Sequence, residues 1–164
     1  MNDKLEILVV EDSPKHIESA RNELSSEGNL TIVSTYKEAI EYLNKQKADV
    51  VLTDERIPFS KARVYPLTDK SFTGLPLPLG SKVVLYAIAK KVPYVALITD
   101  ADHHSDEIAA TLDDFVLLCR EGMFTKALRI GDTDYLQHFG FCQEGVKKFA
   151  GAFNTLLHRP NGVF

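Results

Sequence analysis

Short runs of apolar residues alternate with amphipathic segments along most of the chain. Uninterrupted runs of this kind are typical of strands that are covered on both faces. The segments between them carry apolar residues at helical spacing, with Pro14 and the capping-box pattern from Thr35 to Glu38 marking two helix starts. The predicted strands are Leu5–Val10, Leu30–Ser34, Val50–Thr53, Tyr94–Thr99 and Phe115–Cys119, and the two later helices are Ser81–Lys91 and Gln143–His158.

This alternation predicts an α/β fold with a doubly wound, five-stranded parallel sheet and helices on both faces, of the flavodoxin-like type. The 164 residues fit one domain spanning 1–164. Sheets of this kind bind ligands at the carboxyl ends of their strands, where the strand order reverses. The residues that follow each strand are therefore the first place to look for chemistry.

Acidic residues stand at these strand ends. Glu11 and Asp12 follow the first strand, Asp54 follows the third, and Thr99 and Asp100 close the fourth. Adjacent carboxylates repel one another, so a positive partner is expected. Since no cation is evident in the sequence, a hard divalent ion such as magnesium, which prefers carboxylate oxygens, is the predicted partner.

Composition narrows the class of protein. Hydrophobic residues make up 45% of the chain and charged residues 26%, with a formal net charge of -4 and no basic run, which argues against nucleic acid as a direct partner. No apolar stretch reaches membrane-spanning length, and charged residues before the first strand do not fit a signal peptide. With only Cys119 and Cys142 as cysteines, we expect a cytoplasmic protein.

Taken in order, the motifs resemble the receiver domain of two-component response regulators, over nearly the whole chain. The acid pair of that family is matched by Glu11 and Asp12, and its phosphorylated aspartate by Asp54 in "LTDERIP", where a proline follows four residues later. Its strand-four hydroxyl is matched by Thr99 in "VALITDAD", and its strand-five aromatic by Phe115 in "LDDFVLL".

The resemblance implies a function and a site. Asp54 would accept a phosphoryl group from a histidine kinase or phosphotransfer protein, and the chain would signal through a partner protein rather than act as an enzyme. Magnesium would be held by Asp12, Asp54 and the main-chain carbonyl of Arg56, with Glu11 binding through water. Thr99 would be the switch hydroxyl and Phe115 the switch aromatic.

The sequence departs from the family pattern at strand five. The family carries a lysine there, but aligning "DDF" with the common family form puts Leu118 at that position. Arg120, two residues on, is a candidate substitute, although arginine and lysine are not interchangeable at a tight site.

Two segments are longer than links in such folds usually are. Residues 59–80 are apolar and rich in proline, so we expect them to fold back near the strand ends or to form a contact between two copies of the chain. Residues 120–142 separate the predicted fifth strand from the last helix and contain a candidate hairpin with its turn near Gly131 and Asp132.

Three functions remain open from the sequence. The first is a stand-alone receiver in phosphorelay signalling, favoured by Glu11, Asp12, Asp54 and Thr99. The second is a pseudo-receiver that binds a protein partner without efficient phosphotransfer, favoured by Leu118. A small flavodoxin-like enzyme is the weakest, because no glycine-rich phosphate loop follows the first strand.

Overall fold

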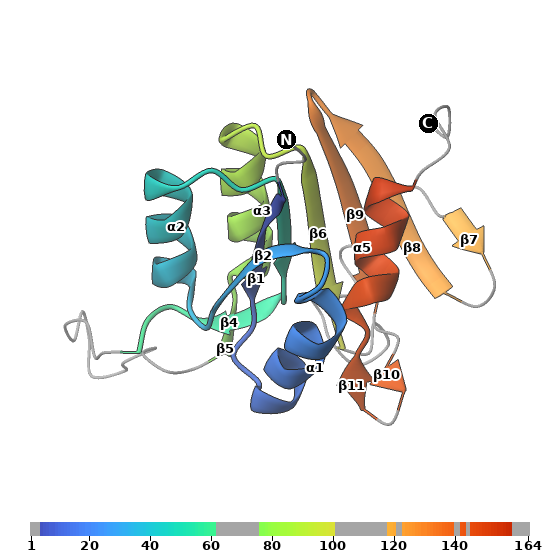
Figure 1. Cartoon of the computed structure of the whole chain (residues 1–164), viewed down its shortest axis with the longest axis horizontal. Coiled ribbons are helices and arrows are strands. Elements are labelled where there is room, and N and C mark those ends of the chain that lie inside the picture. Colours follow the sequence, from blue (N-terminus) through green and yellow to red (C-terminus); the bar gives the residue numbers. More distant parts are fainter. Residues whose placement is uncertain are drawn as a thin grey trace.

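The computed structural model describes residues 4–61, 76–100, 118–120, 123–139, 142–143 and 145–158. Figure 1 shows a central sheet with helices on both sides. The helices are α1 (Pro14–Leu24), α2 (Tyr36–Lys45), α3 (Gly80–Ala89) and α5 (Phe149–Leu157). The strands are β1 (Leu5–Val10), β2 (Gly28–Val33), β3 (Val50–Thr53), β4 (Arg56–Pro58), β5 (Pro76–Pro78), β6 (Tyr94–Thr99), β7 (Leu118–Arg120), β8 (Met123–Ile130), β9 (Thr133–Phe139), β10 (Cys142–Gln143) and β11 (Val146–Lys147).

The main sheet has seven strands in the order β2-β1-β3-β6-β9-β8-β7. The first five are parallel to one another, which confirms the predicted doubly wound parallel sheet. Their order is that of flavodoxin-like folds, in which the strand order reverses between β1 and β3 and ligands bind at that point. Strands β8 and β7 then extend the sheet in antiparallel fashion beyond β9.

The fifth parallel strand is not the one the sequence predicted. Strand β9 pairs with β6 from Tyr94↔Asp134 to Thr99↔Phe139, so residues 133–139 fill that place. Leu118 and Cys119, expected on the fifth strand, instead lie on β7 at the outer edge, separated from β6 by β9 and β8. The hairpin expected near Gly131 and Asp132 is confirmed, since β8 and β9 pair across this turn.

Buried side chains form one core on each face of the sheet. Alternate residues of β1 point to opposite faces, as the period of a strand requires: Leu8 and Val10 pack with α2 and α3, while Ile7 and Val9 pack with α1 and α5. All four of these side chains are fully buried. This burial on both faces explains why the strand reads as an unbroken apolar run. It also holds the end of β1 in place, and Glu11 follows directly after it.

The long 59–80 segment leaves and rejoins the fold close to the end of β3. Strand β4 pairs antiparallel with β5, from Arg56↔Pro78 to Pro58↔Pro76, and α3 begins two residues later. Residues 62–75 lie outside the described part of the chain, so the expected folding back near the strand ends, or contact between two copies, stays a prediction. The last helix begins later than predicted, at Phe149, because Val146 and Lys147 form β11.

Candidate functional site

Glu11 and Asp12 occupy the turn between β1 and α1. The main chain of Glu11 continues the sheet, because its N–H donates to Val33 O at 3.0 Å. Its side chain is fully buried, and Oε1 accepts a hydrogen bond from Ser13 N–H at 3.0 Å. Pro14 then starts α1, as predicted. The turn therefore directs one carboxylate of the pair into the protein, while Asp12 stays partly exposed.

Asp54 follows β3 at the neighbouring strand end. Its main-chain N–H donates to Val10 O at 2.9 Å, which ties the two strand ends together. The residue is 6% exposed, and Oδ1 accepts from Glu55 N–H at 2.7 Å. Glu55 in turn accepts hydrogen bonds from Ser81 N–H and Oγ at the start of α3. The start of α3 thus fixes the residue that orients the Asp54 carboxylate.

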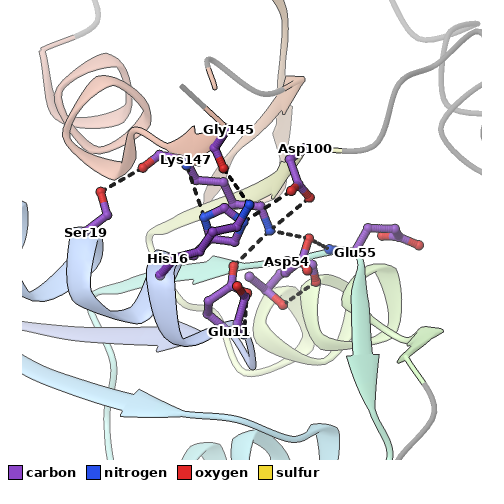
Figure 2. A network of polar contacts seen from close by, with 11 residues as sticks. Glu11, His16, Ser19, Asp54, Glu55, Asp100, Gly145 and Lys147 are labelled. Carbon is purple, nitrogen blue, oxygen red and sulfur yellow. Dashed lines mark hydrogen bonds and ion pairs between the residues drawn. The ribbon is translucent and has the colours of Figure 1, made fainter. Parts of the chain in front are cut away.

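A positive partner of the acids at these strand ends is Lys147 on β11, shown at the centre of Figure 2. Its Nζ lies 2.7 Å from Asp54 Oδ1, 2.8 Å from Glu11 Oε2 and 3.7 Å from Asp100 Oδ1. Lys147 is fully buried, which a lysine tolerates only when its charge is paired. A single ammonium therefore bridges the carboxylates that follow β1 and β3.

The pKa values of these groups reflect burial and one another. Burial raises the pKa of Asp54 to about 6, with Lys147 opposing the rise and Glu11 and Asp100 adding to it. Burial also raises the pKa of Glu11, although the charge of Lys147 acts to lower it. Burial lowers the pKa of Lys147, but its ion pairs with Asp54 and Glu11 outweigh this effect and raise it above the ordinary value. Lys147 is therefore charged at neutral pH.

The donor set fits a hard divalent cation. Ligand oxygens of Glu11, Asp12 and Asp54 lie within 4.8 Å of one another, and Asp12 reaches the partly exposed side of the cluster. Burial raises the pKa of Asp12 as well, and Asp100 adds to this rise. Four carboxylates around one ammonium leave excess negative charge at neutral pH. Carboxylate oxygens open to water are the environment that magnesium prefers.

His16 on α1 joins the cluster from the side of β11. Its ring is 2% exposed, Nδ1 accepts from Lys147 N–H at 3.2 Å, and Nε2 lies 3.2 Å from Asp100 Oδ2. Ser19, one turn further along α1, donates to Lys147 O at 2.8 Å. Helix α1 therefore holds the main chain of Lys147 on both sides, as Figure 2 shows.

The other predicted site residues fall into two groups. Thr99 is buried at the end of β6, and Arg56 begins β4 two residues after Asp54, so both lie at or next to the predicted edge of the sheet. Phe115 lies outside the described residues. Arg120 lies on β7, which β9 and β8 separate from β6, and Lys147 holds the place beside Asp54 for which Arg120 was a candidate. The assignment of Leu118 to the lysine position is wrong for the same reason.

Sequence reasoning missed three residues that shape the site. Lys147 was included in the predicted helix Gln143–His158, although it lies on β11, before the observed start of α5 at Phe149 and after the strand-like "TDYLQHFG". Its place between the segment that forms β9 and the start of α5 is the signal that could have found it. His16 and Glu55 carry no comparable signal, because their partners Asp100 and Ser81 are distant in sequence.

Solved structures with similar folds include two receiver domains. The signal receiver domain of a Luxo repressor protein from Vibrio parahaemolyticus is 19% identical, with a TM-score of 0.45, and the match covers 67% of this chain and 71% of that one. The Francisella response regulator 1452 receiver domain is 17% identical, with a TM-score of 0.44 and coverage of 81% and 83%.

A third match is RcsB from Salmonella enterica serovar Typhimurium, in a structure bound to promoter DNA with phosphomimetic BeF3-. It is 16% identical, with a TM-score of 0.45, over 68% of this chain and 48% of that one. No protein-family model matches the sequence, and no curated protein matches it. Among the described residues, no helix is long and apolar enough to cross a membrane.

Proposed function

We propose that this protein is a receiver module of phosphorelay signalling that accepts a phosphoryl group on Asp54. The observation that carries the proposal is the contact of the buried Lys147 ammonium with Asp54 Oδ1 at 2.7 Å, beside the Glu11 and Asp12 carboxylates. An acceptor carboxylate, a fixed cation and a cluster of acids at one sheet edge supply positioning and charge neutralisation. Phosphoryl transfer requires little else from a protein.

The arrangement supports a simple chemical step. Oδ1 of Asp54 accepts both the Glu55 N–H and the Lys147 ammonium, while Oδ2 takes part in neither contact. Oδ2 is therefore the oxygen that attacks the phosphorus of a donor phosphohistidine. The new P–O bond forms as the P–N bond breaks, and the imidazole leaves with the bonding electron pair. Lys147 offsets the negative charge that gathers around the acceptor.

Magnesium is the proposed cofactor of this site. Asp12 and Asp54 would hold it together with the main-chain carbonyl of Arg56, and Glu11 would bind it through water. When bound, the ion screens the repulsion between the acceptor carboxylate and an incoming phosphoryl anion. Thr99, at the end of β6, is the proposed hydroxyl that hydrogen-bonds a phosphoryl oxygen and so changes the local structure on phosphorylation.

The pseudo-receiver alternative loses its main argument. It rested on Leu118 standing where a lysine is needed, yet Leu118 lies on β7 and a lysine contacts Asp54 from β11. We therefore propose a histidine kinase or a phosphotransfer protein as the donor, and a further protein as the partner that responds.

The test is to incubate the protein with acetyl phosphate, with and without magnesium, and to follow the intact mass. We expect one added phosphoryl group in the presence of magnesium and little without it. A protein that gains no phosphoryl group at any magnesium concentration, while a control receiver is labelled in parallel, would contradict the proposal.

A further inference from the structure

Asp100 adds a carboxylate to the site that the acceptor chemistry does not require. It follows directly after β6, and its Oδ1 lies 3.7 Å from the same Lys147 Nζ that contacts Asp54. Its side chain is 39% exposed, so in isolation it could turn into solvent. Its charge also adds, less than burial and Glu11 do, to the raised pKa of Asp54.

His16 prevents that turn. Because Nδ1 accepts the Lys147 N–H, the ring proton of neutral His16 lies on Nε2 and is donated to Asp100 Oδ2. The ring is 2% exposed on a helix that is packed against β11, so the donor is fixed in space. His16 thus fixes the Asp100 carboxylate with its other oxygen directed towards the ammonium of Lys147.

We propose that the Asp100 carboxylate, held by His16, competes with the phosphoryl group for Lys147 and thereby sets the rate of phosphorylation. This inference rests on the proposed function. An incoming phosphoryl anion approaches an ammonium that already faces three carboxylates, and Asp100 is the one of the three that is neither the acceptor nor a proposed metal ligand. Asp100 therefore slows phosphorylation of Asp54 and disfavours donors of higher negative charge.

The size of the effect follows from the two contacts of Lys147 Nζ, 2.7 Å to Asp54 Oδ1 and 3.7 Å to Asp100 Oδ1, which keep these two carboxylate oxygens close together. A unit charge about 6 Å from a reacting group in a partly solvated site changes a rate by about tenfold. We therefore expect Asp100→Asn to be labelled by acetyl phosphate about tenfold faster than the natural protein. Because a doubly charged anion is repelled more than a singly charged one, labelling by the monoanion phosphoramidate should be accelerated less.

Two substitutions of His16 separate its hydrogen bond to Asp100 from its hydrogen bond with the main chain of Lys147. His16→Gln places an amide near the position of Nε2 and retains a donor for Asp100, whereas His16→Asn places one near Nδ1 and retains an acceptor for Lys147 N–H. We expect His16→Gln to keep the slow rate and His16→Asn to react like Asp100→Asn. Glu18→Gln, on an exposed residue of α1, makes the same change of net charge and is the matched control.

Labelling rates, donor preference and the labelled residue are measured for all of these variants by intact-mass and peptide mass spectrometry. Faster labelling of Asp54 in Asp100→Asn, with a larger gain for acetyl phosphate than for phosphoramidate and no change in Glu18→Gln, supports the inference. Equal rates in Asp100→Asn and the natural protein, or equal gains for the two donors, overturn it while the proposed function stands. Absence of label in every variant overturns both.

Discussion

At the scale of single residues, the site depends on one buried ammonium. Lys147 is fully enclosed and contacts two carboxylates at 2.8 Å or less, so removal of its charge leaves Glu11 and Asp54 buried without a positive counter-charge. Taking one member out of a buried ion pair is more costly than the pair itself is stabilising, because an uncompensated charge remains. The adjacent Lys148 is half exposed and lies 3.7 Å from Glu23, so it has no such role.

Lys147→Met should therefore lower the free energy of unfolding at pH 7 by about 3–5 kcal/mol. Lys148→Met is the matched control, and its effect should stay within about 0.5 kcal/mol because exposed ion pairs contribute little. Urea unfolding followed by circular dichroism measures both. Equal effects of the two substitutions would contradict the assignment of Lys147 as the partner of the acids.

His16 predicts a dependence of stability on pH. Burial lowers its pKa, and Lys147 on β11 and Lys15 on α1 add to this effect against Asp100, which raises it. The unfolded chain therefore binds a proton near pH 6.5 that the folded protein does not, so this contribution to stability is lost as the pH falls below about 6.5. In His16→Gln the loss is removed.

The measurement compares unfolding free energies of the natural protein and His16→Gln between pH 7.5 and about 5.5. The difference between them should change in favour of the variant as the pH falls. Asp54, whose pKa is raised to about 6, changes stability in the opposite direction and is common to both proteins. A difference that does not vary with pH would show that His16 keeps its ordinary pKa.

The sequence was informative about some site residues and not about others for a physical reason. Glu11, Asp12 and Asp54 could be predicted because each follows a buried apolar run, and parallel strands bring their carboxyl ends to one edge. Lys147 could not be paired with them, since its contact with Glu11 spans 136 residues and depends on which segment forms the fifth strand.

At the scale of elements, the start of α3 packs directly against the main chain of Asp54 and Glu55. A Cβ atom added at Gly80 would lie 2.0 Å from Asp54 O and 2.6 Å from Glu55 Cα, both main-chain atoms that cannot move away cheaply. Gly80 N–H also donates to Glu55 O at 2.9 Å. The glycine thus allows α3 to begin close enough for Ser81 to bind Glu55.

Gly80→Ala should destabilise the fold by about 1–3 kcal/mol and slow the labelling of Asp54, because the backbone that positions it must shift. Gly151→Ala is the matched control in α5, where an added Cβ meets nothing within 4 Å. That control should stabilise the protein by about 0.5–1 kcal/mol. Thermal melts and labelling rates together test this pair, and a neutral Gly80→Ala would contradict the close packing.

The elements also show where sequence patterns were insufficient. Strands β1, β3 and β6 were predicted with the observed bounds, because each is largely buried and reads as a continuous apolar run. Strand β9 was assigned to a hairpin alone, since its pairing with β8 is local and its parallel pairing with β6 is not. A strand that pairs antiparallel on one side and parallel on the other has no single sequence pattern that identifies it.

At the scale of the whole molecule, the excess of carboxylates makes a prediction about magnesium. An ion that binds the folded protein but not the unfolded chain stabilises it by mass action. We expect magnesium to raise the melting temperature beyond the effect of sodium chloride at matched ionic strength, and Asp12→Asn to lose most of that extra shift. If the two salts act alike on the natural protein, the acids do not form a metal site.

The most direct test of the account is the position of the label after treatment with acetyl phosphate and magnesium. Peptide mass spectrometry should find one phosphoryl group on Asp54, and Asp54→Asn should remain unlabelled although its fold, monitored by circular dichroism, is intact. Lys147→Met should be labelled more slowly than Lys148→Met. A phosphoryl group on Asp12, Asp100 or a hydroxyl side chain, or undiminished labelling of Asp54→Asn, would contradict the assignment of Asp54 as the acceptor.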